Sequence, residues 1–171
     1  MEKFSNRNAL IHWISAIIIA FMFITGLISS DFDLKHKNAN ILQAHIFIGI
    51  FVLLISLIRV FTILKDQRPK ELETVNKFHF LFKKLVQSLI YLLLIILPTS
   101  GLIIISNSPV DLEILESRPE LLFSKEILDL IEIHEILVYS FLTLIVFHIA
   151  GIFLHMIRTK ENILKRMWLQ D

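Results

Sequence analysis

Four long blocks of apolar residues, separated by shorter polar segments, dominate the pattern along this chain. They cover residues 8–29, 40–64, 85–106 and 130–157. A helix needs roughly 20 residues to cross a hydrocarbon core about 30 Å thick, and each block is long enough. Runs such as 16–24 and 89–97 are continuously apolar and do not alternate, so they do not fit the strands of a membrane barrel. The pattern predicts an all-α integral membrane four-helix bundle.

The composition supports a membrane protein and narrows its chemistry. Of the 171 residues, 55% are hydrophobic, and the mean hydropathy is +0.70. There is no cysteine, which excludes disulfides, iron–sulfur clusters and covalently attached haem. The first apolar block is longer than the core of a signal peptide and has no small-residue cleavage site, so we expect it to remain as a transmembrane helix. Residues 1–171 are read as one membrane domain, with no motif for nucleic acid.

Lysine and arginine are distributed unequally between the two sides of the predicted bundle. If successive helices alternate in direction, one side carries 13 of the 17 basic residues and the other carries 4. The positive-inside rule then places both termini and the second loop in the cytoplasm. The third loop, residues 107–129, contains six acidic residues and is predicted to be periplasmic, with a short amphipathic helix near 120–128. We therefore expect a multi-pass protein of the bacterial inner membrane.

Histidine carries the candidate chemistry of the chain. An ionisable residue inside a membrane helix is costly and usually faces the bundle interior for a functional reason. One such histidine is explained by a hydrogen bond to a neighbouring helix, but five in four short spans favour a bound group. Five of the seven histidines lie within the predicted spans: His12, His45, His134, His148 and His155.

The spacing of four histidines predicts two cross-helix pairs. His134 and His148 are 14 residues apart, which places them on one helix face to within about 40° and separates them by about 21 Å along the axis. In the predicted topology His45 lies at the height of His134, towards the periplasm, and His12 lies nearer the height of His148. Two imidazoles facing each other fill both axial positions of haem b iron, leaving none for oxygen, which favours electron transfer.

Two other uses of histidine fit the pattern less well. A zinc site requires four ligands close together, or three and an open position, and pairs separated by a leaflet do not supply them. A proton relay usually has carboxylates beside its histidines. Here only Glu132 and Glu135 lie near, at the mouth of the fourth span.

Glycine and arginine positions are compatible with haem but do not decide the question. All four glycines lie within spans, and Gly26 follows His12 by 14 residues, on the same face. A glycine there permits close approach either to a porphyrin or to another helix. Arg59 follows His45 by 14 residues, and it fits a partner of haem propionates as well as an interfacial anchor. His148 and His155 share a face, so depth alone does not choose between them as the inner ligand.

With these residues in place, the chain resembles the short bacterial cytochrome b561 family over nearly its whole length. The first and second spans contribute Ile11-His12-Trp13 and His45. The third and fourth contribute Leu97-Pro98 with Gly101, His134-Glu135, His148 and His155, and the tail contributes Asn162-x-Leu164-x-Arg166-Met167. Each fragment alone is weak, whereas four ligand positions in order with the 14-residue gap are fairly specific.

The resemblance implies two b haems within four helices and assigns their iron ligands. His12 and His148 are then the ligands of the cytoplasmic haem, and His45 and His134 those of the periplasmic one. His155 becomes a candidate for a propionate or quinone contact. Relatives carry a histidine near the start of the third helix, where this chain has Gln87 or Lys84, and His79 does not obviously replace it. The resemblance therefore does not carry over any role of that histidine in quinone binding or proton delivery.

These implications lead to a function hypothesis with two alternatives. The leading hypothesis is a membrane electron carrier that exchanges electrons with quinone, ubiquinone or menaquinone; the resemblance includes members that oxidise superoxide at the periplasmic face and reduce ubiquinone. The first alternative is a cytochrome b subunit of a periplasmic dehydrogenase or hydrogenase, whose donor docks on the third loop. The second, of another class, is a haem-free helical transporter or scaffold.

Overall fold

The computed structural model describes residues 2–30, 39–66, 77–108 and 125–169, and within these ranges it contains helices and no strand. Each of the four long helices is long and apolar enough to cross a membrane. The predicted all-α four-helix membrane bundle is therefore confirmed. The elements are α1 (Asn6–Ser30), α2 (Ala39–Lys65), α3 (Lys77–Asn107) and α5 (Lys125–Thr159), followed by the short 3-10 helix η2 (Ile163–Met167).

Two helices start well before the apolar spans that indicated them. α3 begins at Lys77 and α5 at Lys125, whereas the predicted spans begin at residues 85 and 130. The added turns contain charged residues, so hydropathy does not mark them, although they continue the helical backbone. The central part of the predicted periplasmic loop, residues 109–124, lies outside the described residues, and so does His36.

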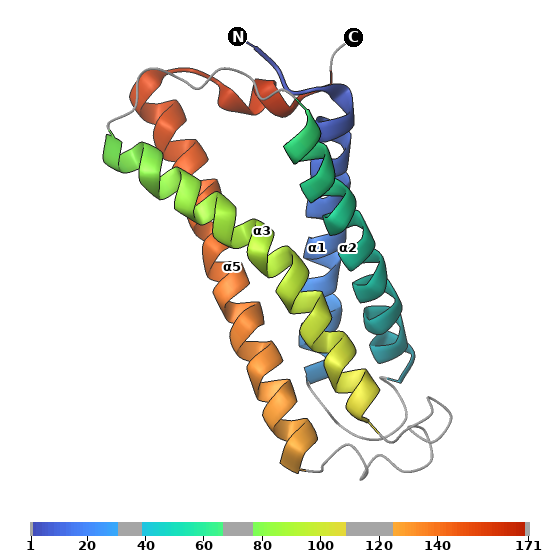
Figure 1. The fold of residues 1–171 in the computed structure, drawn as a ribbon. Helices are drawn as coiled ribbons and strands as arrows, with labels where there is room; N and C mark the ends of the chain where they lie inside the picture. The colour runs from blue at the N-terminus through green and yellow to red at the C-terminus, as the bar shows by residue number, and fades with distance from the viewer. Residues whose placement is uncertain (1, 31–38, 67–76, 109–124, 170–171) are drawn as a thin grey trace.

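The helices pack in chain order. α1 packs against α2, α2 against α3 and α3 against α5, and both ends of the chain lie at the same end of the bundle (Figure 1). Among the described residues, α1 and α5 have no comparable backbone packing; η2 contacts both of them instead. In the middle of the bundle the rings of Phe23 on α1 and Phe141 on α5 stack with their centroids 6.1 Å apart. The α1–α5 side is therefore joined by side chains and by the C-terminal tail.

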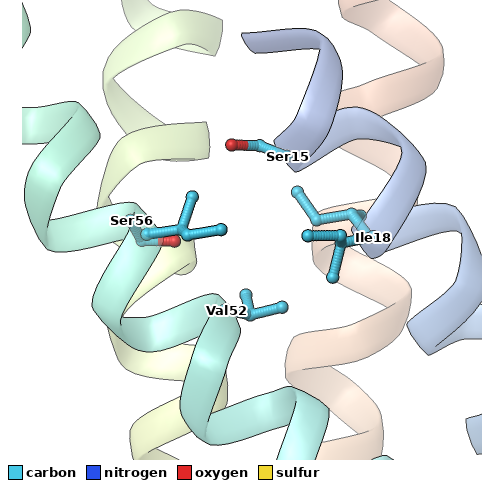
Figure 2. A pocket seen from close by; sticks show the side chains of 6 residues that line it. Ser15, Ile18, Val52 and Ser56 are labelled. Atoms are coloured by element: carbon cyan, nitrogen blue, oxygen red, sulfur yellow. The ribbon is translucent and has the colours of Figure 1, made fainter. Parts of the chain in front are cut away.

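The burial pattern is that of a protein whose solvent is lipid. Large apolar side chains such as Ile17, Leu64 and Ile157 are 69–77% exposed on the outer surface. Hydroxyl side chains are buried among the helices instead, and at the α1–α2 contact Ser15 and Ser56 face a narrow space too small for water (Figure 2). Small polar residues allow close helix packing in membranes, where burial of an apolar side chain contributes van der Waals packing but no hydrophobic free energy.

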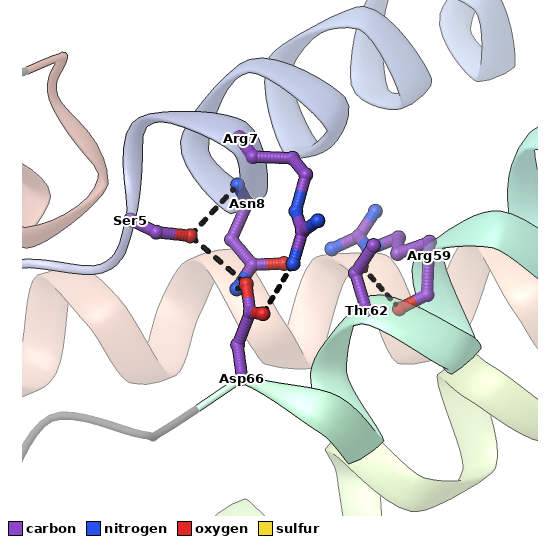
Figure 3. Close-up of polar contacts among 6 residues, drawn as sticks. All are labelled: Ser5, Arg7, Asn8, Arg59, Thr62 and Asp66. Carbon is purple, nitrogen blue, oxygen red and sulfur yellow. Dashed lines mark hydrogen bonds and ion pairs between the residues drawn. The ribbon is translucent and has the colours of Figure 1, made fainter.

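Polar contacts at the end that carries both chain termini tie α1 to α2. Ser5 caps α1, since its Oγ accepts a hydrogen bond from the Asn8 backbone N–H over 3.3 Å. The same hydroxyl donates to Asp66, directly after α2, over 3.1 Å. Asp66 also accepts a hydrogen bond from the side-chain amide of Asn8 over 2.8 Å, and it forms an ion pair with Arg7 (Figure 3).

The C-terminal tail turns back across this end. Lys160 adopts a left-handed conformation with φ 57°, and its N–H donates to the Met156 carbonyl over 2.9 Å, which ends α5. The chain then forms η2. Trp13 on α1 donates its indole N–H to the Met167 carbonyl over 2.8 Å, so the tail contacts the first helix directly.

Candidate functional site

One imidazole at the end of the bundle away from the termini is held between α1 and α2. Nδ1 of His45 lies 3.0 Å from Oγ1 of Thr25. The next residue on α1, Gly26, faces the same ring: a Cβ there would lie 3.2 Å from Cε1 of His45. Gly26 thus provides the space that this imidazole occupies, and Thr25 and the Met22 backbone provide its polar contacts.

A second imidazole is held in the same way between α3 and α5. Nδ1 of His134 lies 2.8 Å from Oγ of Ser100, and a Cβ at Gly101 would lie 3.5 Å from Cε1 of His134. Pro98 precedes this pair inside α3 and removes one backbone hydrogen bond of the helix. A hydroxyl residue followed by glycine therefore faces a histidine on a neighbouring helix twice in the bundle.

The hydroxyl groups indicate which nitrogen of each ring carries the proton. Thr25 Oγ1 is 3.1 Å from the Phe21 and Met22 carbonyls, and Ser100 Oγ is 2.7 Å from the Leu97 carbonyl. A hydroxyl has one proton, so one that donates to a carbonyl can only accept from the imidazole. Nδ1 is then the donor in both rings and Nε2 keeps its lone pair, the tautomer suited to a metal ligand.

His45 and His134 lie within the range of an electrostatic interaction with each other. They come from α2 and α5, two helices without extensive backbone packing. We call the level of this pair the outer level. Both rings are half-buried, and both have the tautomer derived above.

The other pair lies nearer the end with the termini, at what we call the inner level. His12 interacts electrostatically with His148 and with Arg59, and His148 also interacts with Arg59. An Arg59 guanidinium nitrogen lies 2.6 Å from Nδ1 of His12, and its Cζ lies 5.5 Å from the centre of the Tyr91 ring. Arg59 therefore reaches into the bundle beside both histidines, which differs from an anchor in the interface.

His155 and His79 belong to a different region. Nε2 of His155 lies 3.9 Å from Oε2 of Glu161, beyond the last turn of α5. Arg158 donates to Nε2 of His79 over 2.7 Å, which joins the end of α5 to the start of α3. Depth along the fourth span did not distinguish His148 from His155 as the inner ligand. In the structure His148 lies at the inner level, and His155 lies beside the carboxylate of Glu161.

The stacked rings of Phe23 and Phe141 lie between the two levels. Phe141 lies seven residues after His134 and seven residues before His148, and its side chain is buried, with 2% of the residue exposed. Seven residues are about two helical turns, so Phe141 points to the same side of α5 as both histidines. The aromatic pair fills the core between the outer and inner levels.

The histidine side chains of the two levels fit haem b better than they fit a metal ion that needs three or more protein ligands. Within the described residues, no group of three or more histidine, cysteine, aspartate or glutamate side chains is placed to hold a metal. Haem iron instead needs one imidazole on each face of a planar ring. The hydroxyl contacts at Nδ1 leave Nε2 of His45 and of His134, on two different helices, as the atoms that could bind iron. The donor chemistry of the outer level therefore fits haem b.

Two hydroxyl residues were missed in reading the sequence. Thr25 and Ser100 each orient a predicted histidine, but serine and threonine are ordinary in membrane helices and bond their own backbone there. One sequence feature could have identified them: a hydroxyl residue directly precedes a glycine in Thr25-Gly26 and again in Ser100-Gly101.

Imidazole pairs inside a bundle of four membrane-length helices are typical of membrane b-type cytochromes. A family model described as prokaryotic cytochrome b561 matches residues 3–170, nearly the whole chain. The chain belongs to this family, and it is therefore a multi-pass bacterial membrane protein and a b-type cytochrome of electron transfer. No curated protein sequence matches it significantly.

Proposed function

We propose that this protein binds two haem b groups, one at each histidine level, and carries electrons between the periplasmic face of the inner membrane and the quinone pool. The observation that carries the proposal is the outer level, where two imidazoles on different helices keep the same nitrogen free. Family membership supports haem and argues against the haem-free transporter or scaffold.

The proposed ligands are His45 with His134 at the outer level and His12 with His148 at the inner level. When bound, haem b supplies a one-electron carrier, and the protein contributes ligation, orientation and burial. Thr25 holds the His45 ring in position by accepting a hydrogen bond from its Nδ1–H. Such partners fix the tautomer and raise the basicity of a ligating imidazole.

The inner level requires one rearrangement under this proposal. A guanidinium only donates hydrogen bonds, so Nδ1 of His12 accepts from Arg59 and the ring proton lies on Nε2. His12 becomes an Nε2 ligand once Arg59 releases Nδ1. A carboxylate is the natural new partner for the guanidinium, because charge-assisted bonds of this kind are strong. We therefore assign Arg59 to the propionates of the inner haem.

The charge distribution supports the orientation of the two levels in the membrane. Both ends of the chain lie at one end of the bundle. In the sequence, 13 of the 17 basic residues belong to segments on that side, which we assign to the cytoplasm. His45 and His134 then lie towards the periplasm. The specific activity that we propose is oxidation of two superoxide anions, each losing one electron and leaving as O₂, with ubiquinone taking up both electrons and two protons.

Spectroscopy of the purified full-length protein tests this proposal. We expect a pyridine haemochrome count of about two per chain and a low-spin bis-histidine spectrum in both oxidation states. A count near one, or a high-spin spectrum, would contradict the two-level assignment. Stopped-flow mixing with superoxide and a soluble ubiquinone tests the activity: reduction of the haems by superoxide supports it. No reduction, together with co-purification of a large periplasmic subunit, would favour the dehydrogenase or hydrogenase alternative.

A further inference from the structure

A groove lies at the end of the bundle where the N-terminal segment and the C-terminal tail meet. It has a volume of about 430 Å³. It is separate from both histidine levels, and none of its residues takes part in the proposed haem sites. The residues that line it are Lys3, Asn162, Leu164, Lys165 and Trp168.

The two walls of this groove are joined by hydrogen bonds. The Phe4 N–H donates to the Arg166 carbonyl over 3.0 Å, and Nε of Arg166 donates to the Glu2 carbonyl over 3.1 Å. These bonds place Lys3, on the N-terminal wall, opposite the tail that carries Lys165. The groove is thus a built feature of the fold, formed by segments more than 150 residues apart in sequence.

The groove carries two positive charges, Lys3 and Lys165. Among the residues that the structure describes, neither lysine has an ion-pair partner. Arg7, at the same end of the bundle, is by contrast paired with Asp66 (Figure 3). Two ammonium groups on one groove repel each other, and an anion between them would remove this repulsion.

The remaining lining residues are suited to a lipid. Trp168 is 65% exposed, and Leu164 is 36% exposed beside it. Tryptophan is enriched at membrane–water interfaces, where its ring contacts both headgroups and acyl chains. A ligand that matches the whole groove is therefore anionic at one end and apolar at the other.

We propose that this groove binds an anionic phospholipid, with the headgroup phosphate between Lys3 and Lys165 and an acyl chain against Leu164 and Trp168. Basic pockets at the ends of membrane helices recognise anionic headgroups in this way. Asn162 supplies an amide for a headgroup oxygen. Bound lipid would hold the two walls together, and so would strengthen the contact between the tail and α1.

Native mass spectrometry of the full-length protein, titrated with phosphatidylglycerol or phosphatidylcholine, tests this site. The wild type is expected to bind phosphatidylglycerol preferentially. The double variant Lys3→Gln/Lys165→Gln should lose about fivefold in affinity for each lysine, or roughly 25-fold in all. The matched control Lys77→Gln/Lys83→Gln removes the same charge from α3 and should bind like the wild type. Circular dichroism verifies that each variant is folded.

Several results would overturn the proposal. If phosphatidylcholine bound as tightly as phosphatidylglycerol, the two lysines would not select the lipid by its net charge. An equal loss in the control variant would show a general effect of net charge. Inorganic phosphate displacing the lipid at equal concentration would show an anion site without lipid specificity. Trp168→Ala keeps every charge and should still weaken phosphatidylglycerol binding; unchanged binding in that variant would rule out the acyl-chain contact.

Discussion

Arg59 on α2 donates a hydrogen bond to Nδ1 of His12 on α1, and the two nitrogen atoms are 2.6 Å apart. The corresponding nitrogens of His45 and His134 instead contact hydroxyl groups. A hydroxyl both donates and accepts, whereas a guanidinium only donates. The two levels therefore hold their imidazoles by different chemistry, and substitutions at each level should have different consequences.

Arg59→Gln is expected to lower the midpoint potential of the inner haem and to leave that of the outer haem unchanged. Loss of a nearby positive charge stabilises the oxidised form, by on the order of tens of millivolts for a charge about 10 Å away at an effective dielectric constant of about 20. A potentiometric titration followed optically measures both potentials. Arg158→Gln, which removes a guanidinium bonded to His79, is the control. Equal shifts in both variants would contradict the assignment of Arg59 to the inner level.

His134→Ala is expected to remove one haem and retain the other, because the inner pair keeps both of its imidazoles. The pyridine haemochrome count should fall from about two to about one per chain. His79→Ala removes an imidazole outside both levels and should leave the count unchanged. A His134→Ala variant that keeps its full haem content would exclude His134 as a ligand.

Thr25→Val and Ser100→Ala should weaken haem retention at the outer level alone. Loss of a partner that orients a ligating histidine typically costs 10–100-fold in metal affinity. Transfer of haem to excess apomyoglobin measures this loss. Thr143→Val is the matched control, because its hydroxyl bonds the Tyr139 carbonyl of its own helix, on the exposed side of α5. Transfer rates that match the control would show that these hydroxyls do not support the ligands.

Gly26→Ala should displace the His45 ring, since the new Cβ would lie 3.2 Å from Cε1 and the ring must move by a few tenths of an ångström. The low-spin electron paramagnetic resonance signal of the outer haem is expected to shift or broaden. Gly49→Ala tests a neighbouring glycine whose Cβ would meet only the flexible end of Met22 at 3.4 Å. Identical spectra for Gly26→Ala and the wild type would refute a role for this close contact.

Phe141→Ala should destabilise the bundle by about 3–5 kcal/mol, the usual cost of removing a buried phenyl ring. Phe141→Leu retains most of the volume and should cost less than about 1.5 kcal/mol. Thermal unfolding in detergent, followed by circular dichroism, compares them. Phe153→Ala on the same helix removes a ring that is 54% exposed and is the control. A cost for Phe141→Ala no larger than that of the control would mean that the aromatic pair does not support the core.

The fold was predictable because lipid imposes a simple requirement: every spanning segment must be apolar and satisfy its own backbone. The apolar runs therefore indicated the four helices. They did not indicate the first turns of α3, where Lys77 and Lys83 interrupt the pattern although the backbone is helical. Hydropathy indicates which residues are compatible with lipid. It does not indicate the turns of a helix that extend beyond the lipid.

The sequence predicts the register of the candidate site along the helices but not its contacts. The 14-residue spacing of His134 and His148 placed two levels on one helix face, because a helix has a fixed rise and rotation. Which hydroxyl meets which ring depends on how neighbouring helices are rotated about their axes, so Thr25 and Ser100 were not assigned. The reach of Arg59 to His12 likewise required three-dimensional placement.

The way the tail closes the bundle has a consequence for loading of the cofactor. The α1–α5 side is joined by one ring stack and by tail contacts, among them the bond from Trp13 to the Met167 carbonyl. Entry of a flat cofactor from this side would break only these contacts among the described residues and would leave the α1–α2, α2–α3 and α3–α5 interfaces intact. A bundle joined in this way is suited to loading of its cofactor after the helices have been inserted.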